Sequence, residues 1–558
     1  MKKSRRLSLV SAVLTFAGVA AANGSAYAQN DDFELVRNVE TVVNMMRELS
    51  VGYVDPISPD VLMSAAAEGM TDRLDPYTGY MSEEEMKQFE QITTGKYGGI
   101  GAVIRLRGDY VIIAEPYKDS PADRAGLKAG DKIVAINGED ARGFTTEQVS
   151  NRLKGDPNTN VKVTVERLAD GEVVTHKIKR ERISMPGVTY AGWLADGIGV
   201  ICHSDFTEGC YDEMRAAIEQ LRSEGELKGL VLDYRNNGGG FLSEAIKILS
   251  LFVPKGTETV TVRGRNASDE QVYRTPFEPL LPELPLVVLV NGNTASSSEI
   301  VAGTLQDIDR AVLIGSKSFG KGLVQSTVPV GYGAYVKMTT AKYYIPSGRC
   351  IQNIDYSSHD DNVHEVPDSL VNEFSTRNGR KVYDGGGIMP DVRVEEKPFS
   401  RFALTLYAMG YIDEFCDRYV ASRPNLNADS RSFAITDADY DDFTAYVLAK
   451  EVPYTSATRY ALRQLRTAVD ADRYDDRIGA LLEQMENSLN DDTASNMRTY
   501  RDDIVNTIES GIVRRLNYSA GVIERELLSS PEVAAAVELL RDPARYADIL
   551  ENQDTVKK

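Results

Sequence analysis

The sequence predicts an α/β protein that carries a small β-rich module ahead of its α/β part and helical segments at both ends. Strand-like apolar runs alternate with helical stretches between residues 183 and 398, which is an α/β layer pattern. Short strands with Gly-containing turns fill residues 97–182. Segments 29–96 and 399–558 have helical apolar spacing, and the second of them has few Gly or Pro. The 558 residues are enough for several domains.

The N-terminus predicts a signal peptide over residues 1–28. A basic start, "MKKSRR", precedes the apolar run "LSLVSAVLTFAGVAAA", and "AYA" ends at Ala28 as a small-residue cleavage site. The apolar run is too short and too rich in Ser, Thr and Gly for a good membrane span. We therefore expect an exported, periplasmic protein that is cleaved near Ala28, with retention as an uncleaved anchor as the alternative.

Charge and cysteine content exclude some classes of function. The net charge of −20 argues against a nucleic-acid partner, because such a partner requires a basic surface. No C-x-x-C pair occurs, so we expect neither a zinc site nor a thioredoxin-like site. Disulfide bonding and simple burial both remain open for the four cysteines, which are Cys202, Cys210, Cys350 and Cys416.

The first 182 residues predict helices followed by the β-rich module. "VLMSAAAEGMTDRL" has helical spacing, "LDPYTGY" reads as a turn, and "SEEE" (Ser82–Glu85) has the form of a capping box. In the module, "YGGIGAVIRL" and "YVIIAEPY" are strand-like, and "TTEQVSNRLKG" predicts a helix. The final strands, "VKVTVERL" and "VVTHKIKR", are expected to pair across "ADGE".

The α/β part alternates strands and helices in a regular order. The expected strands are "IGVICHSDF", "LKGLVLDYR", "LVVLV", "AVLIG", "GLVQSTVPV" and "AYVKMTTAKYYI". Helices are expected around residues 208–223 and 241–251, and again after "NTASSSE" at residues 293–299. A serine run before a helix is by default an N-cap, but the same position suits a nucleophile.

A nucleophilic serine needs a base to take its proton. Among the four histidines, His203 at the end of a strand is the plausible partner for a triad, although no G-x-S-x-G elbow is present. Lys321 in "SFGKGLVQ" is the other candidate. Ser318 and Lys321 have the S-x-x-K spacing, but the glycines that flank the lysine disfavour the helical turn which that motif needs.

Two sets of motifs resemble a known family. "SPADRAGLKAGDKIVAING" is similar to PDZ domains of the bacterial protease type. "LDPYTGY", "GGIGAVI", "LDYRNNGGG", "NTASSSEI", "SFGKGLVQ", "YYIPSGRCIQ" and "GGGIMPDV" occur in one order, and with the PDZ segment they resemble the carboxy-terminal processing peptidases, or tail-specific proteases. The resemblance covers about residues 35 to 395 and implies a ClpP/crotonase-like core over residues 183–398 with an inserted PDZ domain over residues 97–182.

The resemblance also assigns roles to residues of this chain. It implies that Ser296 is the nucleophile, Lys321 its base, and Gln325 the residue that orients the base. The oxyanion would bind the backbone N–H groups of Ser297 and Gly239 in "NNGGG". The family usually has a proline where this chain has Gly238. A peptide carboxylate would sit on the "YGGIGA" loop of the PDZ module, formed by Gly99, Ile100, Gly101 and Ala102.

These observations predict an exported serine endopeptidase that recognises the C-terminal tails of protein substrates. Its PDZ module would bind the free C-terminus and its Ser–Lys dyad would cleave upstream of that terminus. No metal or organic cofactor is implied. The terminal helices are expected to build a homo-oligomer or a regulated cage, and the sequence names neither a substrate nor an adaptor. The rival hypothesis is an inactive PDZ scaffold with a peptidase-like fold.

Overall fold

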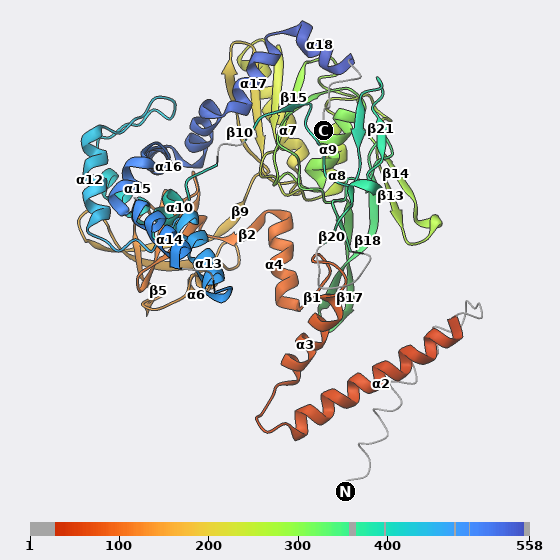
Figure 1. Cartoon of the computed structure of the whole chain (residues 1–558), viewed down its shortest axis with the longest axis horizontal. Helices are drawn as coiled ribbons and strands as arrows, with labels where there is room; N and C mark the ends of the chain where they lie inside the picture. The colour runs from red at the N-terminus through yellow and green to blue at the C-terminus, as the bar shows by residue number, and fades with distance from the viewer. Residues whose placement is uncertain (1–27, 357–363, 396–397, 474–475, 490–491, 552–558) are drawn as a thin grey trace. The chain divides into compact units, whose positions relative to one another are not determined.

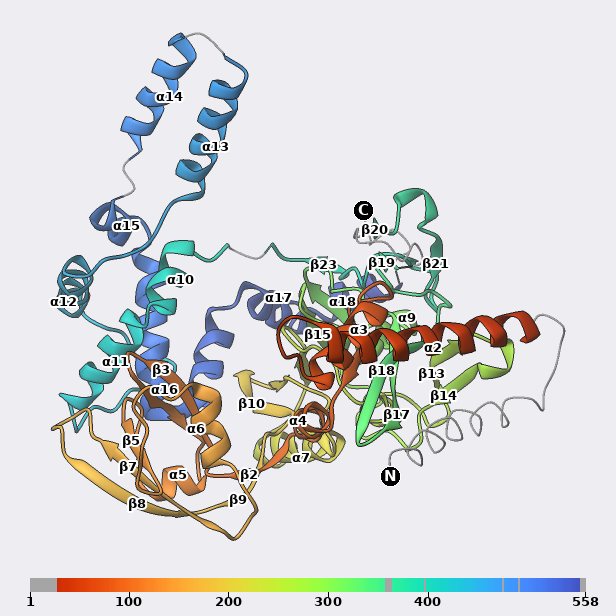
Figure 2. The ribbon, with the colours of Figure 1, turned by 90° about the horizontal axis from the view of Figure 1, so that it is seen from below.

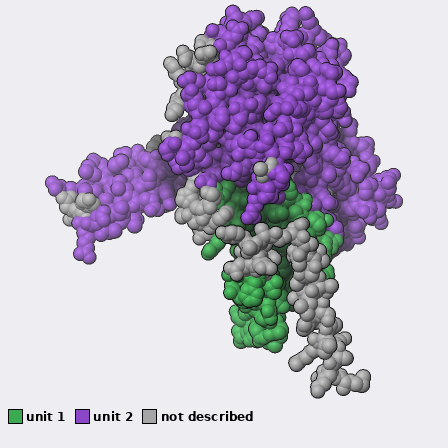
Figure 3. Space-filling model, turned by 90° about the vertical axis from the view of Figure 1, so that its right-hand side faces the viewer, with its two compact units in different colours: residues 1–84, 325–339, 356–362 green, residues 85–324, 340–355, 363–558 purple. Residues whose placement is uncertain are grey.

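The computed structural model describes residues 28–356, 364–395, 398–473, 476–489 and 492–551 (Figure 1). The predicted signal peptide lies outside these residues, except for Ala28. The chain divides into two compact units (Figure 3). Residues 1–84, 325–339 and 356–362 form the first unit, and residues 85–324, 340–355 and 363–558 form the second.

The first unit contains two helices and strands from distant parts of the chain. Helix α3 (Pro59–Thr71) follows α2 (Ala28–Gly52), and the Ser58 hydroxyl caps α3 by accepting the Asp60 N–H (3.2 Å). Strand β1 (Gly79–Met81) pairs antiparallel with β18 (Ala334–Tyr344), with Tyr80 opposite Val336. Strands β17 (Leu323–Gly331) and β18 cross the boundary between the two units.

The second unit includes the predicted β-rich module. Its main sheet has the order β3-β4-β5-β7-β8, with β6 paired to β5, while β2 and β9 pair separately. In β7 the fully buried Val161, Val163 and Val165 alternate with more exposed residues, as expected for a strand with one face in the core. The elements are α4 (Glu83–Thr94), β2 (Lys96–Gly99), β3 (Ala102–Arg107), β4 (Tyr110–Pro116), α5 (Pro121–Arg124), β5 (Lys132–Ile136), β6 (Glu139–Asp140), α6 (Thr146–Leu153), β7 (Asn160–Glu166), β8 (Val173–Lys179) and β9 (Glu181–Ser184).

A six-stranded sheet with the order β10-β11-β12-β15-β16-β23 forms the centre of the α/β part. All neighbouring strands are parallel except β10, an edge strand that the sequence did not signal. The central strands are apolar except for His203 and Asp233 at their carboxyl ends, and helices cover both faces. The strands are β10 (Val188–Ala195), β11 (Ile198–His203), β12 (Gly229–Asp233), β15 (Leu286–Val290), β16 (Val312–Gly315) and β23 (Val392–Arg393).

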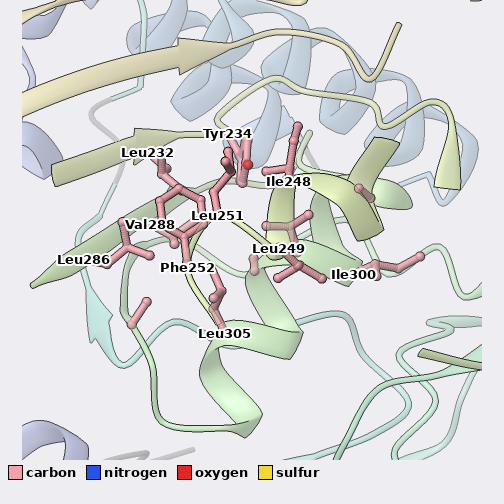
Figure 4. Packing of buried hydrophobic residues seen from close by; sticks show 14 of the residues in the cluster. Leu232, Tyr234, Ile248, Leu249, Leu251, Phe252, Leu286, Val288, Ile300 and Leu305 are labelled. Atoms are coloured by element: carbon pink, nitrogen blue, oxygen red, sulfur yellow. The ribbon is translucent and has the colours of Figure 1, made fainter. Parts of the chain in front are cut away.

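The two faces of this sheet are covered by helices from different parts of the chain. Leu232, Leu286 and Val288 face α7 (Cys210–Glu224), α8 (Leu242–Leu249) and α9 (Ser297–Asp307), and pack around Phe252 (Figure 4). Val231 and Val287 face the opposite way, against the end of α16 (Arg501–Ser529), α17 (Pro531–Leu540) and α18 (Pro543–Glu551). The C-terminal helices therefore complete the core of the α/β part.

Smaller strands flank this core. Strand β13 pairs with β14 and with residues 341–344 of β18, and two short hairpins follow. The elements are β13 (Glu258–Gly264), η1 (Ala267–Asp269), β14 (Gln271–Arg274), β19 (Ile354–Asp355), β20 (His364–Glu365), η2 (Asp368–Leu370), β21 (Glu373–Ser375) and β22 (Lys381–Tyr383). Cys202, Cys210, Cys350 and Cys416 are free thiols in this structure.

Most of the remaining helices form an apolar core with the first half of α16, around Phe402, Phe443 and Ile508. Helices α13 and α14 pair with each other as a hairpin (Figure 2). No helix in the described part of the chain is both long and apolar enough to cross a bilayer. The additional helices are α10 (Arg401–Ala408), α11 (Tyr411–Ala421), α12 (Asp437–Leu448), α13 (Ala457–Ala471), α14 (Asp476–Ser488) and α15 (Thr493–Thr499).

Candidate active site

Ser296 lies in a strained turn between β15 and α9. Its backbone has φ 56° and ψ −118°, a conformation that residues with a side chain rarely adopt. Such strain persists only where the surroundings hold it, and it is concentrated at functional sites. Ser296 is partly exposed, whereas Ser297 and Ser298 are buried. Of the three serines, Ser296 is therefore the one that is accessible to solvent.

The hydroxyls of the two buried serines hold the neighbouring "NNGGG" loop. Ser297 Oγ donates to the Gly240 carbonyl (2.8 Å), and Ser298 Oγ donates to the Asn237 carbonyl (3.0 Å). Both hydroxyls are thus engaged in fixing one loop against another. Of the three serines, Ser296 is the most suitable nucleophile.

Gly239 lies against the backbone of Ser296 and Ser297. A Cβ on Gly239 would be 2.8 Å from Ser296 Cβ and 2.9 Å from Ser297 N, and its φ of 100° also requires glycine. The Ser297 N–H is the first of helix α9 and has no acceptor among the described residues. The Gly239 N–H donates to Asn237 Oδ1 (2.9 Å), so an oxyanion could use it only in exchange for that bond.

Glu299 joins the serine turn to the lysine loop. Its buried carboxylate accepts the N–H groups of Ser296 (2.8 Å) and Lys321 (2.9 Å) on one oxygen. The other oxygen accepts the Ser318 hydroxyl (2.5 Å) and the Gly320 N–H (2.7 Å). Burial raises the pKa of Glu299 to about 7, against the lowering effect of these hydrogen bonds. The sequence alone predicts for Glu299 only a role in capping or packing the helix that follows the three serines.

Tyr343 connects the same two segments from their carbonyl side. Its buried hydroxyl lies within hydrogen-bonding distance of the Ser296 carbonyl (3.2 Å) and of the Lys321 carbonyl. The structure therefore brings the backbones of Ser296 and Lys321 together through two side chains. Sequence reasoning missed Tyr343, whose only signal is its place in the apolar strand "AKYYI".

Gln325 belongs to the first compact unit, whereas Ser296 and Lys321 belong to the second. In the first unit, Gln325 Nε2 donates to Thr339 Oγ1 (3.2 Å). The proposed role of Gln325 in orienting Lys321 stays a prediction.

His203, the alternative base, lies in the core. Its ring packs on those of Phe206 and Tyr234, with centroid distances of 4.4 and 5.4 Å, and it is 1% exposed. Burial lowers its pKa to about 3, so the ring is neutral at physiological pH. This environment is typical of a structural histidine.

The predicted carboxylate loop of the β-rich module is tied to the short helix α5. The Ile100 carbonyl accepts the Ala122 N–H (2.8 Å), and the Gly101 carbonyl accepts the Ser120 hydroxyl (2.8 Å). Gly99 ends β2, and Ala102 begins β3 at an edge of the main sheet. A small cleft of about 40 Å³ opens beside the loop and is lined by Tyr97, Ile100, Gly101, Ala102, Ile104, Ser150, Leu153 and Lys154.

Comparisons with known families match three successive parts of the chain. Peptidase family S41 matches residues 197–359, the PDZ domain matches residues 112–167, and a domain described as "Probable PDZ-protease, C-terminal helical domain" matches residues 402–540. These matches and the fold confirm the predicted α/β peptidase core with its PDZ domain and C-terminal helices.

Two relatives with 34–35% identity support the same assignment. A carboxy-terminal-processing protease of Bartonella bacilliformis is 35% identical over 328 residues, 58% of this chain and 75% of that protein. A probable CtpA-like serine protease of Staphylococcus aureus is 34% identical over 346 residues, 62% of this chain and 68% of that protein. The solved photosystem II D1 C-terminal processing protease is 26% identical and covers 63% of this chain and 86% of its own, with a TM-score of 0.35.

The fold and the site define a PDZ-containing serine protease. Since the relatives are matched over two thirds or more of their length, the family follows: this chain belongs to the carboxy-terminal-processing proteases of peptidase family S41.

Proposed function

We propose that this protein is an exported serine endopeptidase that binds the C-terminal tails of protein substrates on its PDZ domain and cleaves them with a Ser296–Lys321 dyad. The dyad assignment rests on one observation: Glu299 and Tyr343 each form hydrogen bonds to the backbones of both Ser296 and Lys321. The N-terminal basic and apolar segments support export. Mass spectrometry of the mature N-terminus tests the export step, and a chain that retains residues 1–28 would contradict cleavage.

In the proposed mechanism, neutral Lys321 takes the proton of the Ser296 hydroxyl as its oxygen attacks the scissile carbonyl. The peptide C–N bond breaks, the new amine receives that proton, and an acyl-serine ester remains. Water then attacks the ester, giving up a proton to Lys321, and Ser296 leaves with a proton restored. The Ser297 N–H stabilises the negative oxygen in both steps.

A reactive-serine probe tests the choice of nucleophile. We expect a fluorophosphonate to label the purified protein, Ser296→Ala to abolish labelling, and the matched Ser297→Ala variant to retain it. Labelling that survives in a folded Ser296→Ala protein would reject the assignment. A wild-type protein that is folded and takes no label would favour the inactive PDZ scaffold instead.

Substrate recognition is expected to depend on the free C-terminal carboxylate. Amidating the tail removes charge-assisted hydrogen bonds to backbone N–H groups worth about 1.5–3 kcal/mol. At low substrate concentration, the cleavage rate of the amide should therefore be at least about tenfold below that of the acid, since about 1.4 kcal/mol is a factor of ten. Equal kcat/KM values for a matched acid and amide pair would contradict carboxylate docking on the PDZ domain.

A further inference from the structure

The lysine loop has a hydrogen-bond partner for each backbone polar group from Gly320 to Gly322. The Gly320 and Lys321 N–H groups donate to the Glu299 carboxylate (2.7 and 2.9 Å). The Lys321 carbonyl lies within hydrogen-bonding distance of the Tyr343 hydroxyl, and the Gly322 carbonyl accepts the Tyr343 N–H (3.0 Å). Two groups, the Gly320 carbonyl and the Gly322 N–H, are left to partners from another segment.

That segment is residues 352–353, at the end of the motif "YYIPSGRCIQ" and just after it. The Asn353 N–H donates to the Gly320 carbonyl (2.9 Å). Gln352 Oε1 accepts the Gly322 N–H (2.7 Å), and it is the acceptor of that donor among the described residues. Gln352 and Gly322 are both buried, so a side chain without an acceptor at position 352 would leave the donor unsatisfied in the core.

A second hydrogen bond fixes the orientation of the Gln352 amide. Its Nε2 donates to the Ile354 carbonyl (3.0 Å) in strand β19, and this bond directs Oε1 toward the Gly322 N–H. A flipped amide would point its NH₂ group at the Gly322 N–H and its oxygen at a carbonyl, so both hydrogen bonds would be lost. Gln352 therefore links the lysine loop to β19 in a single orientation.

The start of the lysine loop is bonded to another motif of the sequence, "GGGIMPDV". The Ser318 N–H donates to the Ile388 carbonyl (3.0 Å), and the Ile388 N–H donates to Ser318 Oγ (2.6 Å). The Gly387 N–H donates to the Ile351 carbonyl (2.9 Å). The two motifs therefore bind the lysine loop near its two ends, and they are also bonded to each other.

We propose that Gln352 is a positioning residue for the general base. By fixing the Gly322 end of the lysine loop, it sets the direction in which the Lys321 side chain leaves the backbone, and a reacting group displaced by about 1 Å loses roughly a hundredfold in rate. The inference rests on the proposed function, in which Lys321 is the base. It adds a third segment of the chain to the support that Glu299 and Tyr343 give the dyad.

Gln352→Met tests whether the acceptor positions the base. Methionine fills a similar space without an oxygen, so the buried Gly322 N–H loses its partner and the lysine loop shifts. We expect kcat to fall at least about tenfold while KM stays within about twofold, because an interaction that is needed only in the chemical step lowers kcat alone. A folded Gln352→Met protein that keeps the wild-type kcat would overturn the proposal.

Gln306→Met is the matched control. Gln306 is also buried, and its Nε2 donates to the Met389 carbonyl and to Asp391 (2.9 Å each). Within the described residues it has no bond to the lysine loop, so this variant should lose stability while its folded fraction keeps kcat. If its kcat falls as far as that of Gln352→Met, the loss reflects damage to the core in general and the proposal fails.

Gln352→Glu is the conservative variant that should restore activity. Protonated or ionised, a carboxyl group at this position keeps an oxygen that accepts the Gly322 N–H, whereas only the protonated form can donate to the Ile354 carbonyl. We therefore expect a loss of stability at high pH, but a limiting kcat within about threefold of the wild type. A Gln352→Glu protein as slow as Gln352→Met would show that the amide does not act as the acceptor, and would also overturn the proposal.

Hydrogen exchange follows the loop without cleavage. The Gly322 amide should exchange at least about tenfold faster in Gln352→Met than in the wild type, and should stay protected in Gln352→Glu and Gln306→Met. Faster exchange with an unchanged kcat would make Gln352 a structural residue alone. Failure of the proposed function looks different, because then the wild type cleaves no substrate, or Lys321→Arg keeps its kcat, although the exchange pattern persists.

Discussion

Replacing Lys321 by arginine is expected to lower kcat at least about a thousandfold, to the level of Ser296→Ala, because loss of one member of a catalytic unit removes the chemistry of the whole unit. A base must be neutral when it accepts a proton, and a guanidinium does not give up its proton at accessible pH. For the same reason, loss of the Lys321 proton well below 10.4, the ordinary pKa of lysine, should be one of the ionisations through which the wild-type rate rises with pH.

Lys317→Arg is the matched control for this experiment. Lys317 precedes the same loop, is exposed, and has no place in the proposed chemistry, so its variant should keep nearly full kcat. Circular dichroism and the melting temperature establish that each variant is folded. If a folded Lys321→Arg protein keeps more than one-tenth of the wild-type kcat, Lys321 assists by charge alone and another group is the base.

Local pattern predicted much of the fold. The strand before Ser296, the helix after it, and the helices α7 and α8 lie within a few residues of their expected positions, because apolar periodicity and glycine or serine punctuation are local signals. The antiparallel edge strand β10 escaped notice since "VTYAGWLA" is only half-buried and lacks a clean alternation.

What the sequence could not predict are contacts between distant residues. Arg235 could have been a surface residue, yet it is largely buried against Glu532, almost 300 positions further along the chain. Glu299 had the spacing of a helix cap, and only the folded chain brings Ser318 and Lys321 to it. The spacing of a capping box predicts that a carboxylate lies at the start of the helix. The partners of that carboxylate from other segments depend on tertiary packing and cannot be read from the spacing.

Glu299→Gln is the second substitution with a large expected effect, about a hundredfold on kcat, because displacing a reacting group by about 1 Å costs that much. All four partners of the carboxylate donate to it, and an amide replaces one accepting oxygen by an NH₂ group. The Ser318 hydroxyl can rotate to accept from that NH₂, but the Gly320 N–H cannot, so the lysine loop must shift.

Glu244→Gln is the control for burial of a carboxylate. Glu244 is also buried, accepts the Tyr211 N–H (3.0 Å) and pairs with Lys247, but has no bond to the Ser296 turn or to the lysine loop. This variant should lose stability without a comparable loss of kcat in the folded fraction. If Glu299→Gln folds and keeps kcat within threefold of the wild type, Glu299 does not position the dyad.

The raised pKa of Glu299 predicts that stability and activity change in opposite directions with pH. Because the folded state holds this proton more tightly than the unfolded state, protonation of Glu299 favours folding, and its contribution to stability falls as pH rises from about 4.5 to about 7. Activity should change the other way, since only the ionised carboxylate accepts all four donors. We therefore expect wild-type kcat to fall as pH drops through 7. We also expect the free energy of unfolding of Glu299→Gln minus that of the wild type to be larger at pH 8 than at pH 5, because the wild type loses stability over this interval. Chemical denaturation of both proteins at pH 5 and pH 8 measures this difference, and a difference independent of pH would place the pKa of Glu299 outside this range.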